Sequence, residues 1–250
     1  MQKLKDKIVF ISGASSGIGK ACAEAFAKAG AHLILCARST DKVKAVAEEL
    51  QNKYKIEILS FGLDVQDKKL VNAAIDDLPE KWREIDILVN NAGILSKASI
   101  EELDEAEWDK VMNINVKSTM FASQQVLKHM ISQGWGRIIN ISSLAGRMGG
   151  FSTGCAYSTS KAAILGMTMC IARKVAKNNI TVNAIAPGTT ESELLKGFTP
   201  EELKKLEEAI PVGRLGKPEN IAETVVFLAS DAASFITGAV IDVNGGMFMG

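Results

Sequence analysis

Residues 7–19 read KIVFISGASSGIG, an apolar run that changes abruptly into a glycine-rich turn. The run is typical of a buried strand, and the spacing G-x-x-x-G-x-G leads directly into a segment of helical period. In a strand, turn and helix of this kind, backbone amides and the positive end of the helix dipole converge on one point. The sequence therefore predicts a site for the pyrophosphate of a nucleotide cofactor, formed by Gly13, Ser15, Ser16, Gly17, Ile18 and Gly19.

Two other interpretations of this turn involve chemistry. It is not a P-loop, because Lys20 is followed by Ala21 rather than by a Mg²⁺-binding hydroxyl, and this disfavours nucleotide triphosphate hydrolysis. Residues 13–17 also spell G-x-S-x-G, the pattern of a hydrolase nucleophile elbow. That machinery needs a later histidine, and the only one is His129, among apolar neighbours in a helical segment. A turn that serves packing alone remains an alternative.

Outward from this turn, short apolar runs alternate with helical segments along the whole chain. The expected strands are Lys7 to Ser12, His32 to Ala37, Ile56 to Phe61, Ile85 to Asn90, Arg137 to Ser142, Ile180 to Ala186 and Ala239 to Val243. The expected helices begin near Gly17, Asp41, Asp67, Ala106, Tyr157 and Pro218. This alternation predicts an α/β fold: a Rossmann-type, doubly wound sheet of about seven parallel strands with helices on both faces. We expect a single domain over residues 1–250.

One irregular insertion, Gly188 to Pro211, interrupts the alternation and contains a charged amphipathic stretch, Glu201 to Glu208. Long irregular connections in compact domains often cover active sites, so a substrate lid is expected around residues 189–211. A solvent-exposed helical excursion is the alternative.

Composition excludes several classes of protein. The 250 residues are 47% apolar, enough for a packed core, and 29 basic residues balance 29 acidic ones, which argues against nucleic acid or a membrane surface as partner. The four cysteines lie far apart and are expected to be reduced and mostly buried. Two histidines are too few for a His-rich metal site, and no metal is expected. With no visible signal peptide, the expected location is cytoplasmic.

Residues after the second and third strands extend the predicted nucleotide site. Arg38 stands where a dinucleotide fold places an acid for a ribose or a base for a 2′-phosphate, and no acid precedes Asp41. A guanidinium binds phosphate well, so NADP(H) is preferred over NAD(H), although Arg38 could be an ordinary surface residue. Asp64 and Val65 are placed at the adenine, with a helix-capping aspartate as the alternative.

Tyr157 and Lys161 are spaced i, i+4 on a predicted helix, which puts a phenol beside an ammonium. A neighbouring cation favours phenolate and is expected to lower the pKa of the phenol from about 10 towards a range useful for acid–base catalysis. The pattern alone is common on solvated helices. Here a strand ending in hydroxyls, Ser142 and Ser143, lies upstream at the edge of the sheet where such folds bind ligands.

Taken together, these motifs resemble the short-chain dehydrogenase/reductase family over essentially the whole chain. They are the glycine turn, Asn90 to Gly93, Ser143, Tyr157 with Lys161, Pro187-Gly188 and Asp242 to Gly246. The resemblance implies catalytic roles for Asn115, Ser143, Tyr157 and Lys161: Tyr157 donates the proton, Lys161 lowers its pKa and holds the nicotinamide ribose, Ser143 orients the substrate oxygen, and Asn115 fixes a helix kink and a relay water. It also implies cofactor contacts at Asn91, Ala92, Gly93, Tyr157, Lys161, Pro187, Gly188, Thr190 and Ser192.

Two of these assignments choose between neighbours. Ser143 is preferred over Ser142 as the second serine of its doublet, and Asn115 over Asn113 by its distance from Trp108. Without the resemblance, Asn115 could equally satisfy backbone groups inside a helix. Ser12 stands where the family usually has threonine, and the hydroxyl is kept.

Within the family, the chain is most similar to the branch of 3-oxoacyl-acyl-carrier-protein reductases, on residues 210–216 and the Asp242 to Gly246 ending. The implied activity is NADPH-dependent reduction of a ketone to a secondary alcohol by hydride transfer, with a 3-oxoacyl thioester as substrate. Arginines that the branch carries near two helix ends are replaced by Gln133 or Gly134 and by Asn178, which weakens that assignment.

The substrate contacts expected besides Ser143 are apolar, and they could equally be core residues: Leu95, Leu144, Phe151 and Leu194. Dehydrogenation of a sugar, steroid, 3-hydroxy acid or other alcohol is the alternative activity, and a non-catalytic nucleotide-binding scaffold the remote one. The resemblance also implies a homotetramer.

Overall fold

The protein, described from a computed structural model over residues 4–150, 153–195 and 197–250, is built around one sheet. Seven parallel strands lie in the order β3-β2-β1-β4-β5-β6-β7. They are β1 (Ile8–Ser12), β2 (His32–Ala37), β3 (Ile58–Gly62), β4 (Ile87–Asn90), β5 (Gly136–Ile141), β6 (Ile180–Pro187) and β7 (Val240–Val243). The order reverses beside β1, between β1 and β4, and ligands bind at such a switch point in doubly wound folds.

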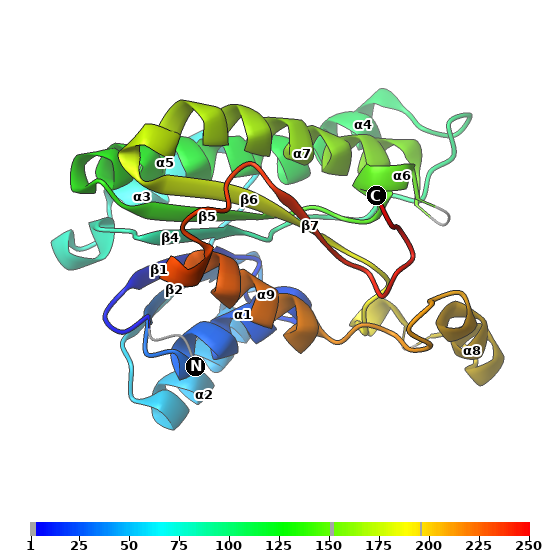
Figure 1. The fold of residues 1–250 in the computed structure, drawn as a ribbon, viewed down its shortest axis with the longest axis horizontal. Helices are drawn as coiled ribbons and strands as arrows, with labels where there is room; N and C mark the ends of the chain where they lie inside the picture. The colour runs from blue at the N-terminus through cyan, green and yellow to red at the C-terminus, as the bar shows by residue number, and fades with distance from the viewer. Residues whose placement is uncertain (1–3, 151–152, 196) are drawn as a thin grey trace.

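Helices cover both faces of the sheet (Figure 1). On one face lie α1 (Gly17–Lys28), α2 (Thr40–Tyr54) and α9 (Pro218–Ala229), and on the other α3 (Lys68–Asp76), α4 (Glu105–Met112), α5 (Ser118–Gln133) and α7 (Cys155–Val175). Shorter elements are η1 (Glu80–Arg83), the π-helical η2 (Asn113–Lys117), α6 (Ala145–Met148), η3 (Ala176–Asn178), η4 (Glu193–Leu195), α8 (Pro200–Glu208) and η5 (Asp231–Ala233). The predicted fold class is confirmed.

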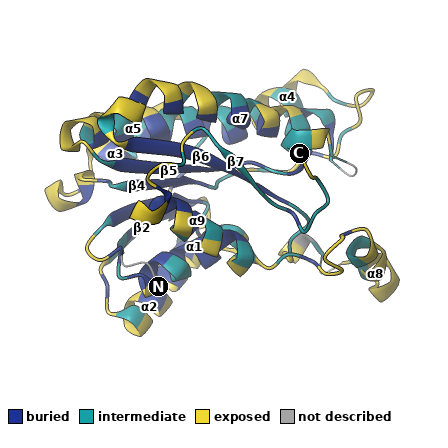
Figure 2. Cartoon of the chain, viewed as in Figure 1, coloured by how far each residue is buried: buried dark blue, intermediate teal, exposed yellow. Residues whose placement is uncertain are grey.

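Burial on both faces explains why the strands read as continuous apolar runs. All five residues of β1 are buried, and Figure 2 shows the central strands buried throughout. One core cluster includes Phe26 and Val225 and fills the layer under α1, α2 and α9, while the other includes Val126 and Met130 under the opposite helices. The packed helices hold the strands in place, and the candidate site lies at the carboxyl ends of the strands.

The Gly188 to Pro211 insertion forms η4 and α8, and α8 projects from the body of the molecule (Figure 1). A capping box begins α8, with the Thr199 side chain accepting from the Glu202 amide at 3.2 Å. No residue of α8 is buried. This is the geometry of an exposed excursion, so a lid role would require the helix to move.

The cysteines only partly match their prediction. Cys22 and Cys36 are buried, whereas Cys155 is half-buried and Cys170 is exposed on α7, so "mostly buried" is wrong for half of them. Their thiols are free, as predicted. Within the residues that the structure describes, no helix combines the length and apolarity needed to cross a bilayer.

Candidate active site

The glycine turn joins β1 to α1 with a backbone that only glycine adopts readily. Gly13 and Gly17 have φ of +69° and +53°, in the left-handed region, and Ser16 caps α1 in an extended conformation. A Cβ on Gly19 would collide with the carbonyl oxygen of Gly13. The turn can therefore close tightly over the N-terminus of α1, and residues of the turn line a cavity.

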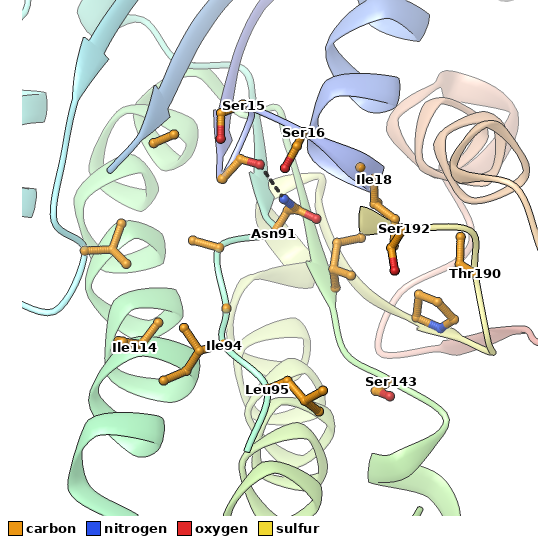
Figure 3. Close-up of a pocket in the computed structure, with 18 of the residues that line it drawn as sticks. Ser15, Ser16, Ile18, Asn91, Ile94, Leu95, Ile114, Ser143, Thr190 and Ser192 are labelled. Carbon is orange, nitrogen blue, oxygen red and sulfur yellow. Dashed lines mark hydrogen bonds between the residues drawn. The ribbon is translucent and has the colours of Figure 1, made fainter. Parts of the chain in front are cut away.

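That cavity, of about 550 Å³, runs along the carboxyl edge of the sheet (Figure 3). Nearly all predicted cofactor residues line it: Gly13, Ser15, Ser16, Gly17, Ile18, Arg38, Asp64, Val65, Asn91, Ala92, Gly93, Tyr157, Lys161, Pro187, Gly188, Thr190 and Ser192. Gly19 does not, because it is buried at the contact between α1 and the turn. Gly19 packs against the turn, and its contact with the cofactor stays a prediction.

Sequence reasoning missed several lining residues: Ala37, Ser39, Leu63, Ile94, Ile114, Ile141, Ser142 and Glu191. Most are apolar and end or follow strands. Their positions could have been inferred from the strand ends, but no motif marks them.

Ser12 and Asn91 fasten the loop after β4 to the glycine turn. The Ser12 hydroxyl accepts from the amides of Asn91 and Ala92, both at 3.1 Å. The Asn91 side chain donates to the carbonyls of Ser12 and Gly13, both at 3.0 Å. The serine that replaces threonine at position 12 keeps the bonds that need its hydroxyl.

Gly93 brings this loop against two predicted catalytic residues. A Cβ there would stand 3.2 Å from Asn115 Oδ1 and 3.4 Å from Lys161 Nζ. Asn115 itself is fully buried in the π-helical turn η2, where the sequence predicts a kink. Its side chain accepts from the Ile94 amide at 2.8 Å and donates to the Ser160 hydroxyl at 2.9 Å. Asn115 does not line the cavity, and it holds the loop and α7 together behind it.

The two serines after β5 point to different tasks. The Ser142 hydroxyl, in a residue only 3% exposed, donates to the Lys161 carbonyl at 2.7 Å. Ser143 is half-buried, its hydroxyl accepts from the Ala145 amide at 3.1 Å, and it acts to lower the pKa of the Tyr157 phenol. Its side chain lies in the cavity in Figure 3. The geometry therefore favours Ser143 over Ser142 for contact with a reacting group.

Lys161 and Tyr157 lie on one face of α7, with the ammonium 5.7 Å from the phenol ring centroid. Lys161 Nζ donates to the Ile141 carbonyl at 2.9 Å. Burial lowers the pKa of Lys161 to about 8. Burial also raises the pKa of Tyr157, while its hydrogen bond with Ser143 lowers it by less. The sequence predicts a lowered phenol pKa, and the structure shows the opposite direction because desolvation of the phenolate dominates.

The predicted substrate contacts are only partly brought together. Leu95 lines the cavity and is 37% exposed. Leu144 does not line it: its side chain is buried in the core, and its amide donates to the Pro187 carbonyl at 2.9 Å. Phe151 and the side chain of Leu194 lie outside the described residues.

Known proteins are similar to this chain in sequence and in architecture. A family model described as enoyl-(acyl carrier protein) reductase matches residues 13–248. The 3-oxoacyl-(acyl-carrier-protein) reductase FabG of Aquifex aeolicus is 41% identical over 98% of this chain and 99% of that protein.

Solved structures match the fold over nearly the whole chain. A protein from Beutenbergia cavernae, described as an NAD(P)-dependent gluconate 5-dehydrogenase and solved with NADP at low occupancy, matches with a TM-score of 0.92 and 35% identity, over 98% of both chains. A 3-oxoacyl-(acyl-carrier protein) reductase from Brucella melitensis matches with a TM-score of 0.93 and 33% identity, over 98% of this chain and 92% of that one. The matches cover nearly the whole chain, and they agree with the glycine turn, the Tyr157–Lys161 pair and the strand order. The chain therefore belongs to the short-chain dehydrogenase/reductase family.

Proposed function

We propose that the protein reduces a ketone to a secondary alcohol with NADPH, and that its substrate is a 3-oxoacyl thioester. The observation that carries this proposal is one cavity lined both by the glycine turn and by Ser143, Tyr157 and Lys161. A scaffold that only binds a nucleotide would not need a buried lysine, a phenol and a serine hydroxyl at the same cavity.

The residues present fit a bound NADP(H). The turn at Gly13 to Ile18 offers amides at the start of α1 for the pyrophosphate, and Arg38, exposed at the end of β2, offers a guanidinium for a 2′-phosphate. Asp64 and Val65 also line the cavity and would contact the adenine, and Asn91 to Gly93 with Lys161 would contact the nicotinamide ribose. When bound, NADPH supplies the hydride that the carbonyl carbon accepts.

The chain's own residues supply the proton, a hydrogen bond and a positive charge. As negative charge develops on the carbonyl oxygen, the Tyr157 phenol transfers its proton to that oxygen and Ser143 donates a second hydrogen bond to it. The Lys161 ammonium favours the phenolate that remains. Hydride on carbon and proton on oxygen together give the secondary alcohol.

The apolar lining favours a carbonyl flanked by hydrocarbon. Leu95 is the labelled apolar side chain that lies nearest to Ser143 in Figure 3, while Ile94 and Ile114 line the cavity farther from it. A polyhydroxylated chain beside Leu95 would leave hydroxyls unpaired. The name of the Aquifex aeolicus relative points to the same substrate class. Dehydrogenation of a sugar acid is the second candidate, favoured by the gluconate 5-dehydrogenase description of the Beutenbergia cavernae structure.

The test is NADPH oxidation with an acetoacetyl thioester, simple ketones and a keto-gluconate in parallel, with Tyr157→Phe as the blank. Fast turnover of the thioester that Tyr157→Phe loses is expected. Turnover confined to the keto-gluconate would move the function to the second candidate, and no turnover of any carbonyl would contradict a reductase.

We extend the proposal to the assembly and location of the protein. A homotetramer is supported by exposed apolar residues on the outer faces of α5 and α7, Ile131 at 46% and Met169 at 52% exposure. Sedimentation as a monomer would contradict it. A cytoplasmic location and a lid motion of residues 189–211 also stay predictions.

A further inference from the structure

Arg147 connects α6 to the segment that follows β7. Its guanidinium carbon lies 4.6 Å from the ring centroid of Phe248, and one amino group donates to the Gly250 carbonyl at 3.2 Å. The same amino group lies 3.3 Å from a carboxylate oxygen of Asp242 in β7. Three contacts made by one side chain therefore join parts of the chain about a hundred positions apart in sequence.

The Arg147–Asp242 pair is mostly shielded from water. The two side chains are 22% and 18% exposed. Arg147 Nε and Asp242 Oδ1 are buried without a hydrogen-bond partner among the described residues. Burial raises the pKa of the Asp242 carboxyl, and Arg147 opposes that rise. A shielded pair with open hydrogen-bonding capacity is costly, and such pairs persist where they fix one arrangement of neighbouring elements.

The element that Arg147 fixes touches two residues of the active site. The Ala145 amide donates to the Ser143 hydroxyl at 3.1 Å, and the Gly146 amide to the Ser143 carbonyl at 2.9 Å. Gly146 of α6 also packs directly against α7, because a Cβ on Gly146 would stand 2.7 Å from the carbonyl carbon of Lys161. A shift of α6 would therefore displace Ser143 relative to Lys161.

The segment Met247–Gly250 reaches the base of the insertion as well. The Thr189 hydroxyl contacts the Met247 sulfur at 3.9 Å, and the Val212 amide donates to the Gly245 carbonyl at 3.1 Å. A Cβ on Gly246 would lie 3.2 Å from Pro211. Both ends of the insertion thus contact residues 245–247, which lie in sequence between Asp242 and Phe248, two residues that Arg147 contacts.

We infer that Arg147 is a positioning residue for ketone reduction: by binding Asp242 and the segment Met247–Gly250, it holds α6, and with it Ser143, in register with the base of the 189–211 insertion. This inference rests on the proposed function for its effect on turnover. Its effect on local structure is independent of any substrate.

The kinetic test is a double-mutant cycle of Arg147→Ala and Asp242→Asn, read as kcat and KM for the acetoacetyl thioester and as Kd for NADPH. Displacing a positioned group by a fraction of an ångström to an ångström lowers turnover by about 10- to 100-fold, and we expect that loss in kcat for Arg147→Ala. The Kd for NADPH should not change, because Arg147 contacts Asp242, Phe248 and Gly250 and none of these residues lines the cavity proposed for the nucleotide. The double variant should be no slower than the slower single variant.

Two further variants separate positioning from general damage. Arg147→Lys keeps the charge opposite Asp242 but loses the flat contact with Phe248, and it should recover part of kcat. Arg173→Ala removes an exposed arginine of α7 and should leave kcat unchanged. Losses that multiply in the double variant, or an unchanged kcat in Arg147→Ala, would overturn the inference.

Hydrogen exchange tests the same inference without a substrate. Arg147→Ala should speed amide exchange in residues 145–148 and 247–250 and leave α1 unchanged. If the wild-type protein reduces no ketone, the proposed function fails while this result still decides the structural role of Arg147. Unchanged exchange in both segments would refute that role whatever the activity.

Discussion

The two ends of the active-site cavity differ in the groups that they offer to a ligand: backbone groups at the glycine turn and side chains at Tyr157. At the glycine turn, most lining residues are glycines and serines, so backbone amides are the main groups that the turn offers to a ligand. At the Tyr157 end, they are side chains whose burial changes their pKa. The first end suits a constant ligand that binds through phosphates, and the second suits chemistry that can be tuned residue by residue. Changes at one end should therefore affect cofactor affinity, and changes at the other should affect turnover.

The largest difference in kcat is expected between variants of the two serines after β5, Ser142 and Ser143. Ser143→Ala removes a hydrogen-bond donor to the developing oxyanion and should lower kcat by about 100- to 1000-fold with an unchanged Kd for NADPH. Ser142→Ala should keep most of kcat and lower the free energy of unfolding by about 1 kcal/mol, through loss of the bond to the Lys161 carbonyl. Steady-state kinetics and urea unfolding of both variants check this. Equal losses of kcat would show that the two hydroxyls do not divide their tasks.

At the other end, Arg38 should determine which cofactor is used. Arg38→Asp replaces a charge-assisted hydrogen bond to a phosphate by repulsion and should shift the NADPH/NADH ratio of kcat/KM by about 10- to 100-fold towards NADH. The kcat at saturating NADH should stay close to that of the wild type. An unchanged ratio would remove Arg38 from the cofactor site.

Gly19 tests the glycine-turn end of the cavity, and Gly166 in α7 is the control. Gly19→Ala places a methyl group against the Gly13 carbonyl and should lower the free energy of unfolding by about 1–3 kcal/mol and weaken NADPH binding. Gly166, inside α7, has nothing within 4 Å of an added Cβ, so Gly166→Ala should raise that free energy by up to about 1 kcal/mol. Thermal unfolding and NADPH titration test both. A neutral Gly19→Ala would mean that the turn can relax.

The pH dependence should come from the side-chain end alone. Reduction needs Tyr157 protonated and Lys161 charged, and burial puts the pKa of Lys161 at about 8 and that of Tyr157 above its ordinary value. The kcat/KM for reduction should therefore be level below pH 8 and fall above it, by up to about tenfold per pH unit. Alcohol oxidation, which needs the phenolate, should change in the opposite direction. A reduction profile that stays level well above pH 8 would contradict the charge state assigned to Lys161.

Most of the fold and the nucleotide-binding end could be predicted from sequence because their signals are local. Apolar runs mark the strands, and the glycine turn adjoins its own strand and helix. Two predicted site residues, Gly19 and Leu144, do not line the cavity, because the local sequence does not report the direction in which a residue faces. Gly19 belongs to the same motif as Gly17 but faces the turn, and Leu144 adjoins Ser143 but faces the core.

Other properties of the site depend on contacts between distant residues. The pKa of Tyr157 is set by desolvation in the folded chain, which no i, i+4 spacing reports. Arg147 has no sequence signal because its partners, Asp242 and Phe248, come from the far end of the chain.

The central claim is that Tyr157 acts on the chemistry and not on cofactor binding. Its most direct test is a single-turnover measurement of NADPH oxidation by an acetoacetyl thioester, comparing the wild type with Tyr157→Phe after the Kd for NADPH of both has been measured. We predict equal Kd values and a rate reduced by about 100- to 10,000-fold in Tyr157→Phe. A variant that binds NADPH equally well and turns over at the wild-type rate would contradict the assignment of the proton donor.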